Sequence, residues 1–299
     1  MHDNGLSIGF AGLGSMGGRV VERLLDAGYD VSGWNRSPGK AKALEGKGMR
    51  SVATPRELAA GADVVLSMVS DTAAVEQILT GPDGLLGGLG PRSVYADMST
   101  IAPDASQELS EAVARTGAAM LDAPVSGSIA TLEAGELSIM VGGDEAAYER
   151  IKPVLLAIGP KVSRIGDNGQ ALRTKVAVNL ALVVQVIGFC EGVALAERGG
   201  VRRETAVEAM LNSVVSSPVL KYRGPFILEG RMPDDAFADV DLQQKDLLLA
   251  LDLGRKLGVP LPTAAASNEL LNACRGLGIG RHDFVVVYEV YRRLAGMDR

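Results

Sequence analysis

The chain has 299 residues, of which 47% are hydrophobic and 22% are charged, and its formal net charge at pH 7 is -6. These proportions are typical of a folded protein and exclude a disordered or low-complexity chain, while the length allows two domains of ordinary size. The lysines and arginines are spread along an acidic chain, so the composition argues against nucleic acid or an anionic membrane surface as a partner.

The two cysteines, Cys190 and Cys274, are far apart and outside any metal-binding spacing, so we expect neither a disulfide framework nor a bound metal. The first residues contain no basic segment followed by an apolar export signal, and we therefore expect a cytoplasmic protein. The longest mainly apolar run, 176–190, is interrupted by Asn179 and Gln185 and is shorter than the ~20 residues of a membrane span. It is better interpreted as a core helix.

Up to about residue 165, short segments rich in β-branched residues alternate with helical patterns. Strands that alternate with helices in this way indicate a mostly parallel sheet covered by helices. Residues 1–165 are therefore predicted to form an α/β domain. In chain order we predict a strand at 6–12, a helix at 17–27, a strand at 29–35, a helix at 37–46, strands at 62–69 and 93–99, a helix at 103–116 and a strand at 118–124.

After residue 165 the hydrophobic period becomes helical, and Gly and Pro breakers occur at "ERGG", "SSPV" and "GVPLPT". The segment "GDNGQALRTK" has the glycines and the Asx-type cap that precede a helix, so we expect a long helix at about 169–197. This helix is predicted to join the first domain to an all-α domain at 166–299. Because one chain has little surface to cover so apolar a helix, we also expect a homodimer or homotetramer.

The segment "IGFAGLGSMGGRV" places three glycines in a G-x-G-x-x-G pattern between a predicted strand and a predicted helix. In such a turn the first glycine permits the tight bend, the second lets a pyrophosphate approach the backbone, and the third allows close packing of helix on strand. We therefore predict a Rossmann-type dinucleotide-binding domain with the pyrophosphate at the start of the helix. The alternative is that the glycines serve the turn alone. The predicted cofactor contacts here are Gly12, Leu13, Gly14, Ser15, Met16 and Gly17.

The next predicted strand ends at "WNRSPGK", about twenty residues further on. An acid at this place holds the ribose hydroxyls of NAD, whereas a basic residue accommodates the 2′-phosphate of NADP. This chain has Asn35, Arg36 and Ser37 there, with Lys40 one turn later, so NADP(H) is predicted in preference to NAD(H). The alternative interpretation of Arg36 is a solvated loop cation.

Reduction of a carbonyl requires an acid that protonates the developing alkoxide, and histidine is the usual candidate. The only histidines, His2 and His282, lie near the amino terminus and in a predicted late loop. Lysine is the next candidate, and Lys175 and Asn179 are four residues apart on one face of the long predicted helix. The alternative is that the ammonium of Lys175 reaches water along its alkyl chain.

Six segments occur in an order and spacing similar to the β-hydroxyacid dehydrogenase family, which the chain resembles over nearly its whole length. The segments are "GFAGLGSMGGRV", "WNRS", "ADMST", "DAPVSGS" followed by "GELSIMVGG", "GDNGQALRTKVAVN" and "QQKDLLLALDLGRKLGVPLP". Within the family the chain looks most like the glyoxylate/succinic semialdehyde reductase branch. The resemblance implies NADPH-dependent, reversible reduction of a small aldehyde that carries a carboxylate, of the glyoxylate or succinic semialdehyde type.

Other activities remain open at this point. Within the family they are those of a 3-hydroxyisobutyrate dehydrogenase or a tartronate semialdehyde reductase. Outside it they are an imine reductase, in which the motif lysine is usually lost, or a non-catalytic NADP-binding protein.

The resemblance also implies roles for single residues, the first of which is that Lys175 is the general acid or base. Asn179 would orient the substrate, and Ser126 would hydrogen-bond its carboxylate or carbonyl as a third catalytic residue. Gly127 would add a backbone donor. The further implied substrate contacts are Thr100, Phe237 and Asp246, and the further implied cofactor contacts are Met68, Val69, Thr100 and Lys245.

Several positions depart from the family pattern. Around the lysine, Ala171 replaces a glycine and Val178 replaces the first asparagine, and Ser128, Thr131 and Leu132 replace small residues after the serine motif. We therefore expect an altered loop after Ser126.

Towards the carboxyl terminus, Ala238 stands where relatives have an aromatic residue, and Asp241 and Leu242 stand where the semialdehyde reductases have a basic pair. A pocket without those groups is expected to accept succinic semialdehyde poorly.

Overall fold

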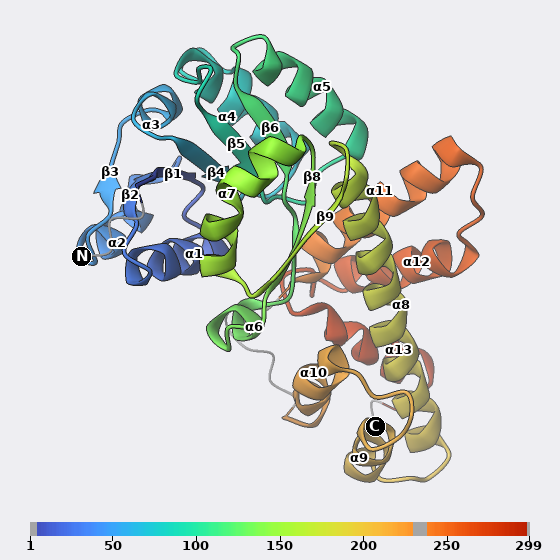
Figure 1. Cartoon of the computed structure of the whole chain (residues 1–299). Coiled ribbons are helices and arrows are strands. Elements are labelled where there is room, and N and C mark those ends of the chain that lie inside the picture. Colours follow the sequence, from blue (N-terminus) through green and yellow to red (C-terminus); the bar gives the residue numbers. More distant parts are fainter. Residues whose placement is uncertain (1–4, 230–237, 298–299) are drawn as a thin grey trace. The chain divides into compact units, whose positions relative to one another are not determined.

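The computed structural model describes residues 5–229 and 238–297 (Figure 1). The chain divides into two compact units, Met1–Lys175 and Val176–Arg299. The division falls inside the long helix α8 (Gln170–Arg198), whereas the sequence placed a domain boundary just before that helix. The reason is that the first turn of α8 belongs to the first unit: Leu172 is fully buried in a hydrophobic cluster of that unit.

A nine-stranded sheet forms the centre of the first unit, in the order β3-β2-β1-β4-β5-β6-β8-β7, with β9 paired to β8. Strands β1 to β6 are parallel, and β8 is antiparallel to β6 and β7, so the predicted mostly parallel sheet is confirmed. The strands are β1 (Ser7–Ala11), β2 (Asp30–Trp34), β3 (Arg50–Ser51), β4 (Val64–Ser67), β5 (Val94–Asp97), β6 (Ala119–Asp122), β7 (Val125–Ser126), β8 (Ser138–Gly142) and β9 (Lys161–Gly166).

Four of these strands, β3, β7, β8 and β9, have no counterpart among the predicted strands. Strands β3 and β7 have two residues each, and β9 is a largely exposed edge strand, so these three lack the run of buried apolar residues that marks a central parallel strand.

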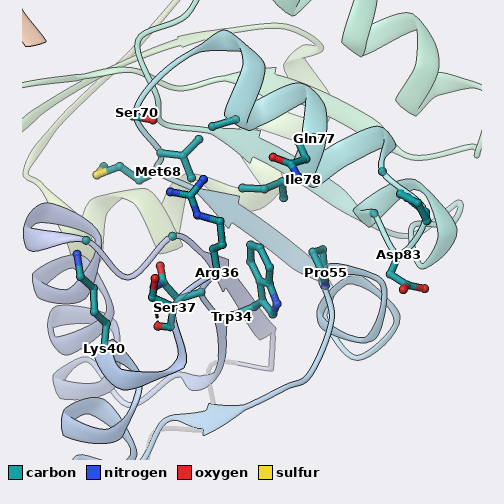
Figure 2. A pocket seen from close by; sticks show the side chains of 18 residues that line it. Trp34, Arg36, Ser37, Lys40, Pro55, Met68, Ser70, Gln77, Ile78 and Asp83 are labelled. Atoms are coloured by element: carbon teal, nitrogen blue, oxygen red, sulfur yellow. Dashed lines mark hydrogen bonds between the residues drawn. The ribbon is translucent and has the colours of Figure 1, made fainter.

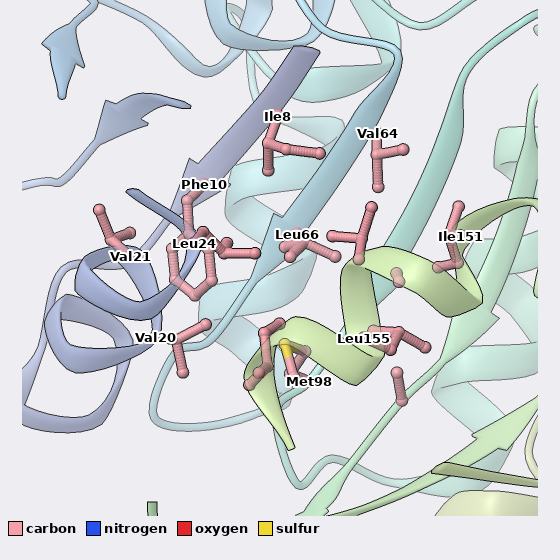
Figure 3. Packing of buried hydrophobic residues seen from close by; sticks show 14 of the residues in the cluster. Ile8, Phe10, Val20, Val21, Leu24, Val64, Leu66, Met98, Ile151 and Leu155 are labelled. Atoms are coloured by element: carbon pink, nitrogen blue, oxygen red, sulfur yellow. The ribbon is translucent and has the colours of Figure 1, made fainter. Parts of the chain in front are cut away.

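Helices cover both faces of the sheet because side chains alternate along each strand. On one face, Ile8 and Phe10 of β1 pack against Val20 and Leu24 of α1 and Ile151 of α7 (Figure 3). The opposite face packs against α3, α4 and α5. The helices of this unit are α1 (Ser15–Asp26), α2 (Lys42–Glu45), α3 (Pro55–Ala60), α4 (Thr72–Thr80), α5 (Pro103–Ala114), α6 (Ile129–Glu133) and α7 (Glu145–Ile158), with 3-10 turns at Pro38–Lys40 and Leu85–Gly87.

The second unit is helical throughout its described residues, apart from one isolated bridge between Asp239 and Asp283. The predicted all-α second part and its long first helix are thus confirmed. Besides α8, the helices are α9 (Arg203–Leu211), α10 (Pro218–Glu229), α11 (Val240–Leu257), α12 (Pro262–Gly276) and α13 (Val287–Leu294), with a 3-10 turn at Phe284–Val286.

By length and composition alone, α8 could cross a membrane, because its most apolar 18-residue window has a mean hydropathy of 1.9. In the folded chain 44% of that window is buried. The core helix of a water-soluble protein can meet the same criterion, so composition is only weak evidence of a membrane span.

Candidate active site

The turn between β1 and α1 has the geometry that its glycines allow. Gly12 has φ +103°, and a Cβ on it would lie 2.3 Å from the carbonyl oxygen of Met68. A Cβ on Gly17 would lie 2.1 Å from the carbonyl oxygen of Gly12. At Gly14, the N-cap of α1, a Cβ would meet no atom within 4 Å. Two glycines therefore serve the fold, and the third leaves open space at the helix start that an anion can occupy.

A cavity of about 500 Å³ lies beside this turn, at the carboxyl ends of β1, β2 and β4, where ligands bind in open α/β sheets. Figure 2 shows the side chains that line it. The predicted cofactor residues on its wall are Gly12, Gly14, Asn35, Arg36, Ser37, Lys40, Met68 and Val69.

The other predicted residues of the turn lie away from this cavity. Leu13 and Ser15 line a neighbouring depression, which also includes Gly14 and Lys40, and Met16 packs against the hydrophobic core.

Asn35 holds the glycine turn in place. Its Oδ1 accepts a hydrogen bond from the backbone N–H of Leu13 at 2.9 Å, and its Nδ2 donates to the carbonyl of Ser37 at 2.9 Å. The amide of Asn35 is therefore engaged with the backbone. The side chains that remain at the end of β2 for a ribose or phosphate are those of Arg36 and Ser37.

Two cations, Arg36 and Lys40, face this cavity. The side chains of Arg36 and Lys40 are exposed, and neither makes an ion pair or a hydrogen bond with any residue in the described ranges. In Figure 2, Arg36 extends beside the Trp34 indole toward Met68. Unpaired cations in a cavity are suited to binding an anionic group of a ligand.

Part of the cavity wall was not predicted from the sequence. Trp34, Pro55, Gln77 and Ile78 line it, and Trp34 Nε1 donates to the carbonyl of Ala53 at 3.2 Å. The position of Trp34, next to the predicted Asn35, was the signal that could have identified it.

A buried polar cluster stands behind Val69. The backbone N–H of Val69 donates to Ser99 Oγ at 3.0 Å, and Ser99 and Ser67 each donate to Asp97 Oδ1, at 2.7 and 2.6 Å. Burial raises the pKa of the Asp97 carboxyl, although the hydrogen bonds from Ser67 and Ser99 oppose this shift. The cluster fixes the ends of β4 and β5, beside which the partly buried Thr100 lies.

The Ser126 loop is held by a glycine that no other residue could replace without strain. Gly127 has φ +144°, and a Cβ on it would lie 2.7 Å from Leu137 Cδ1 and 3.0 Å from Thr131 Cβ. Ser126 itself pairs with Ser138 in the β7–β8 ladder and is partly buried. Both predicted substrate contacts therefore lie on a segment held by strand pairing and by close packing around Gly127.

The departures from the family pattern after Ser126 build a short helix. Ser128 and Thr131 form a capping box at the start of α6, and Leu132 is 1% exposed in the hydrophobic core. The end of the helix is tied to α1, because Arg19 Nε lies 2.8 Å from Glu133 Oε1. The substituted residues therefore order this loop.

Asp122 anchors the first turn of α8 and was not predicted as a site residue from the sequence. Its two carboxylate oxygens accept hydrogen bonds from the N–H groups of Gly169 at 2.8 Å and Leu172 at 2.9 Å. Burial raises the pKa of Asp122, and these backbone hydrogen bonds oppose the shift. An acid at the end of a predicted strand was the available signal. Asp122 thus positions the helix that carries Lys175.

Lys175 lies in the second turn of α8 and is 8% exposed. The alternative in which its ammonium extends into open solvent does not fit this burial. Arg173, two residues earlier, points to a different set of partners: its guanidinium lies 3.3 Å from Gln107 Oε1 and 3.8 Å from Asp104 Oδ1.

In the second unit, three predicted residues come together between α8 and α11. Asn179 is 4% exposed, and its Nδ2 donates to Asp246 Oδ2 at 2.5 Å. Lys245 Nζ lies 2.8 Å from the other oxygen of Asp246. The amide of Asn179 is therefore held in one orientation by a buried carboxylate.

The remaining predicted positions have different outcomes. Phe237 lies outside the described residues. Asp241 is engaged in ion pairs with Arg275 at 3.1 Å and Arg281 at 3.6 Å, and Leu242 is 40% exposed. Within residues 5–229 and 238–297, no three His, Cys, Asp or Glu side chains are grouped so that they could hold a metal ion.

Comparison with known proteins gives two family matches that together span most of the chain. Residues 7–166 match the family described as the NAD binding domain of 6-phosphogluconate dehydrogenase. Residues 169–291 match the family described as NAD-binding of NADP-dependent 3-hydroxyisobutyrate dehydrogenase.

Individual relatives are similar over nearly their whole length. The chain is 32% identical to 2-(hydroxymethyl)glutarate dehydrogenase of Eubacterium barkeri, covering 99% of this chain and 98% of the relative. It is also 32% identical to glyoxylate/succinic semialdehyde reductase 1 of Arabidopsis thaliana, covering 96% and 99%. The crystal structure of 3-hydroxyisobutyrate dehydrogenase from Salmonella typhimurium superimposes with a TM-score of 0.87 at 31% identity, covering 95% of this chain and 99% of that one.

Proposed function

The chain belongs to the β-hydroxyacid dehydrogenase family of NAD(P)-dependent oxidoreductases, and from this premise we propose that it uses NADPH to reduce a small aldehyde that carries a carboxylate. The product is the corresponding hydroxy acid, and the reaction is reversible. The aldehydes we expect are glyoxylate and short semialdehydes.

The residues of the cofactor cavity fit a nicotinamide dinucleotide. The open space over Gly14 at the start of α1 suits the pyrophosphate, and the wall of Trp34, Pro55 and Ile78 suits a planar apolar ring. Arg36 and Lys40 suit a 2′-phosphate, which supports a preference for NADPH over NADH. When bound, the reduced nicotinamide supplies the hydride.

Lys175 is the proposed proton donor. As negative charge develops on the carbonyl oxygen, the ammonium of Lys175 gives that oxygen a proton, and in the reverse reaction the neutral amine removes it. Asn179 lies one turn further along the same helix and is proposed to orient the substrate, while Ser126 and the N–H of Gly127 bind the carboxylate. The observation that carries this assignment is the buried lysine one turn before an asparagine whose amide is fixed by Asp246.

Replacement of Lys175 tests the assignment. Lys175→Ala should lower kcat for aldehyde reduction by about 100- to 10,000-fold, because a positioned general acid typically contributes this much. The dissociation constant of NADPH, measured by fluorescence titration, should stay within a few-fold of the wild type.

Arg173→Ala is the matched control, because Arg173 is a cation two residues earlier on the same helix that is bonded to Gln107 and Asp104 instead. It should keep kcat close to that of the wild type. Near-normal turnover of Lys175→Ala with NADPH bound would show that another group supplies the proton.

A further inference from the structure

Gln243, on α11, is a buried amide whose oxygen has no hydrogen-bond partner among the described residues. The residue is 6% exposed, and its Oε1 accepts no hydrogen bond from any residue in the described part of the chain. A buried amide without a partner loses its hydrogen bonds to water and gains nothing in return. Such a group is retained at a cost to stability, and a ligand that hydrogen-bonds to it would recover the loss.

The neighbouring residue shows what a structural glutamine looks like in the same helix. Gln244 is 4% exposed, and its Nε2 donates to Asn268 Oδ1 at 3.0 Å and to Asn272 Oδ1 at 2.7 Å. Its Oε1 accepts from Arg275 at 3.0 Å. The two glutamines are similarly buried. Among the described residues, both amide atoms of Gln244 have hydrogen-bond partners, whereas Oε1 of Gln243 has none.

The position of Gln243 connects it with the proposed substrate contacts. Gln243 lies three residues before Asp246 on α11, and residues at this spacing share one face of a helix, with Cβ atoms about 5–6 Å apart. Asp246 is the residue that fixes the amide of Asn179. Gln243 therefore lies one helical turn from the carboxylate that holds the amide proposed to orient the substrate.

The charges near Gln243 indicate which chemical group it can bind. The two preceding residues on α11 are Asp241, whose carboxylate is engaged with Arg275 and Arg281, and Leu242, which is partly exposed. Neither is a cation, and Lys245, two residues after Gln243, is paired with Asp246 at 2.8 Å. Burying a carboxylate against an uncharged amide is unfavourable. A neutral group that can donate and accept a hydrogen bond, such as a hydroxyl, matches the amide in either orientation.

We propose that Gln243 determines substrate specificity by hydrogen-bonding a hydroxyl on C2 of a three-carbon hydroxy acid or its aldehyde, the carbon between the carboxylate and the reacting carbon. The inference rests on the proposed function and narrows it to substrates of the 2,3-dihydroxy acid type. A methyl group at C2 leaves the amide unpaired, and a second carboxylate at C2 would lie against an uncharged amide.

The test uses three stable 3-hydroxypropanoates, oxidised in the reverse direction with NADP⁺, that differ in their C2 substituent. Racemic glycerate has a hydroxyl, 3-hydroxyisobutyrate has a methyl, and 2-(hydroxymethyl)glutarate has a carboxyethyl group. In the wild type, kcat/KM for glycerate should exceed that for 3-hydroxyisobutyrate by about 10- to 100-fold, because the analogue without the hydroxyl leaves a buried polar group unpaired. The carboxyethyl compound should be the poorest substrate.

Gln243→Leu should bring the glycerate to 3-hydroxyisobutyrate ratio close to one, through loss of activity on glycerate alone. The melting temperature should be unchanged or higher, since the replaced amide had no partner. Gln243→Met, a closer match in shape, provides the same comparison if the leucine variant folds poorly. Gln244→Leu is the matched control and should lower the melting temperature without changing the ratio, because its amide is bonded to Asn268, Asn272 and Arg275.

The outcomes separate this inference from the proposed function. If 3-hydroxyisobutyrate is oxidised as efficiently as glycerate by the wild type, or if Gln243→Leu changes both in proportion, the role of Gln243 is refuted while the dehydrogenase activity stands. Weaker NADP⁺ binding as the sole effect of Gln243→Leu would also refute it. If none of the three acids is oxidised and no aldehyde is reduced, the proposed function itself fails.

Discussion

Two arginines, one in each unit, show how differently the two parts of the chain use charge. Arg36 of the first unit is exposed at the cofactor cavity and has no ion pair or hydrogen bond within the described residues. Arg223 of the second unit is buried, with its Nε 2.9 Å from Asp283 Oδ1 and its guanidinium 4.6 Å from the Phe284 ring centre. A cation kept in water costs little and remains available to a ligand, whereas a buried cation must be paired when the chain folds.

The two units also differ in how they surround a carboxylate. In the first unit, burial raises the pKa of Asp97, which lies at the end of a central strand. In the second unit, the hydrogen bond from Arg203 lowers the pKa of Glu197. In the first unit, the buried Asp97 is hydrogen-bonded by hydroxyl and backbone groups. In the second unit, Glu197 is paired with Arg203.

The largest effect is expected from removing the buried cation of the second unit. Arg223→Met leaves the fully buried Asp283 without its ion-pair partner and should lower the free energy of unfolding by about 3–5 kcal/mol. Urea unfolding followed by circular dichroism measures this. At temperatures where the variant is folded, its affinity for NADPH should equal that of the wild type, and a loss below 1 kcal/mol would mean that the pair contributes little.

A smaller and different effect is expected from the exposed cation of the first unit. Arg36→Ala should raise the KM for NADPH by about 10- to 100-fold, the value of one charge-assisted hydrogen bond to the 2′-phosphate, while the KM for NADH stays the same. The unfolding curve should not shift. Lys42→Ala, which removes an exposed cation outside the cavity, controls for net charge. Equal losses for both cofactors would exclude a 2′-phosphate contact.

The smallest effects are expected from pH, and they should have opposite signs in the two units. Glu197 has a lowered pKa, so its contribution to stability is present above 4.5 and is lost as the pH falls through its folded pKa. Asp97 has a raised pKa, so its contribution is present below 3.8 and is lost as the pH rises through its folded pKa.

These signs can be read from the variants Glu197→Gln and Asp97→Asn. Relative to the wild type, Glu197→Gln should flatten the loss of unfolding free energy on the acid side of pH 4.5. Asp97→Asn should flatten the loss that develops as the pH rises above 3.8. Urea titrations between pH 3 and 7 give the unfolding free energy of each variant as a function of pH. If the difference from the wild type changed with pH in the same direction for both variants, the predicted opposite signs would be wrong.

Much of the first unit could be predicted because its signals are local. Gly12 is required by its positive φ and Gly17 by a contact within the turn that contains it, and strands β1, β2 and β4 to β6 show the buried runs of a parallel sheet. Asp122 was missed for the opposite reason. Asp122 acts on backbone groups of α8 that lie 47 and 50 residues away in sequence.

The sequence by itself determined the fold class, the dinucleotide turn, the cations after β2 and the lysine and asparagine four residues apart on one helix. Each of these depends on residues that are neighbours along the chain. The tertiary structure alone decided which polar groups are satisfied. Gln243 and Gln244 are adjacent and identical in type, yet one has three partners from α12 and the other has none among the described residues, because hydrogen bonding of a buried group depends on which distant side chains reach it.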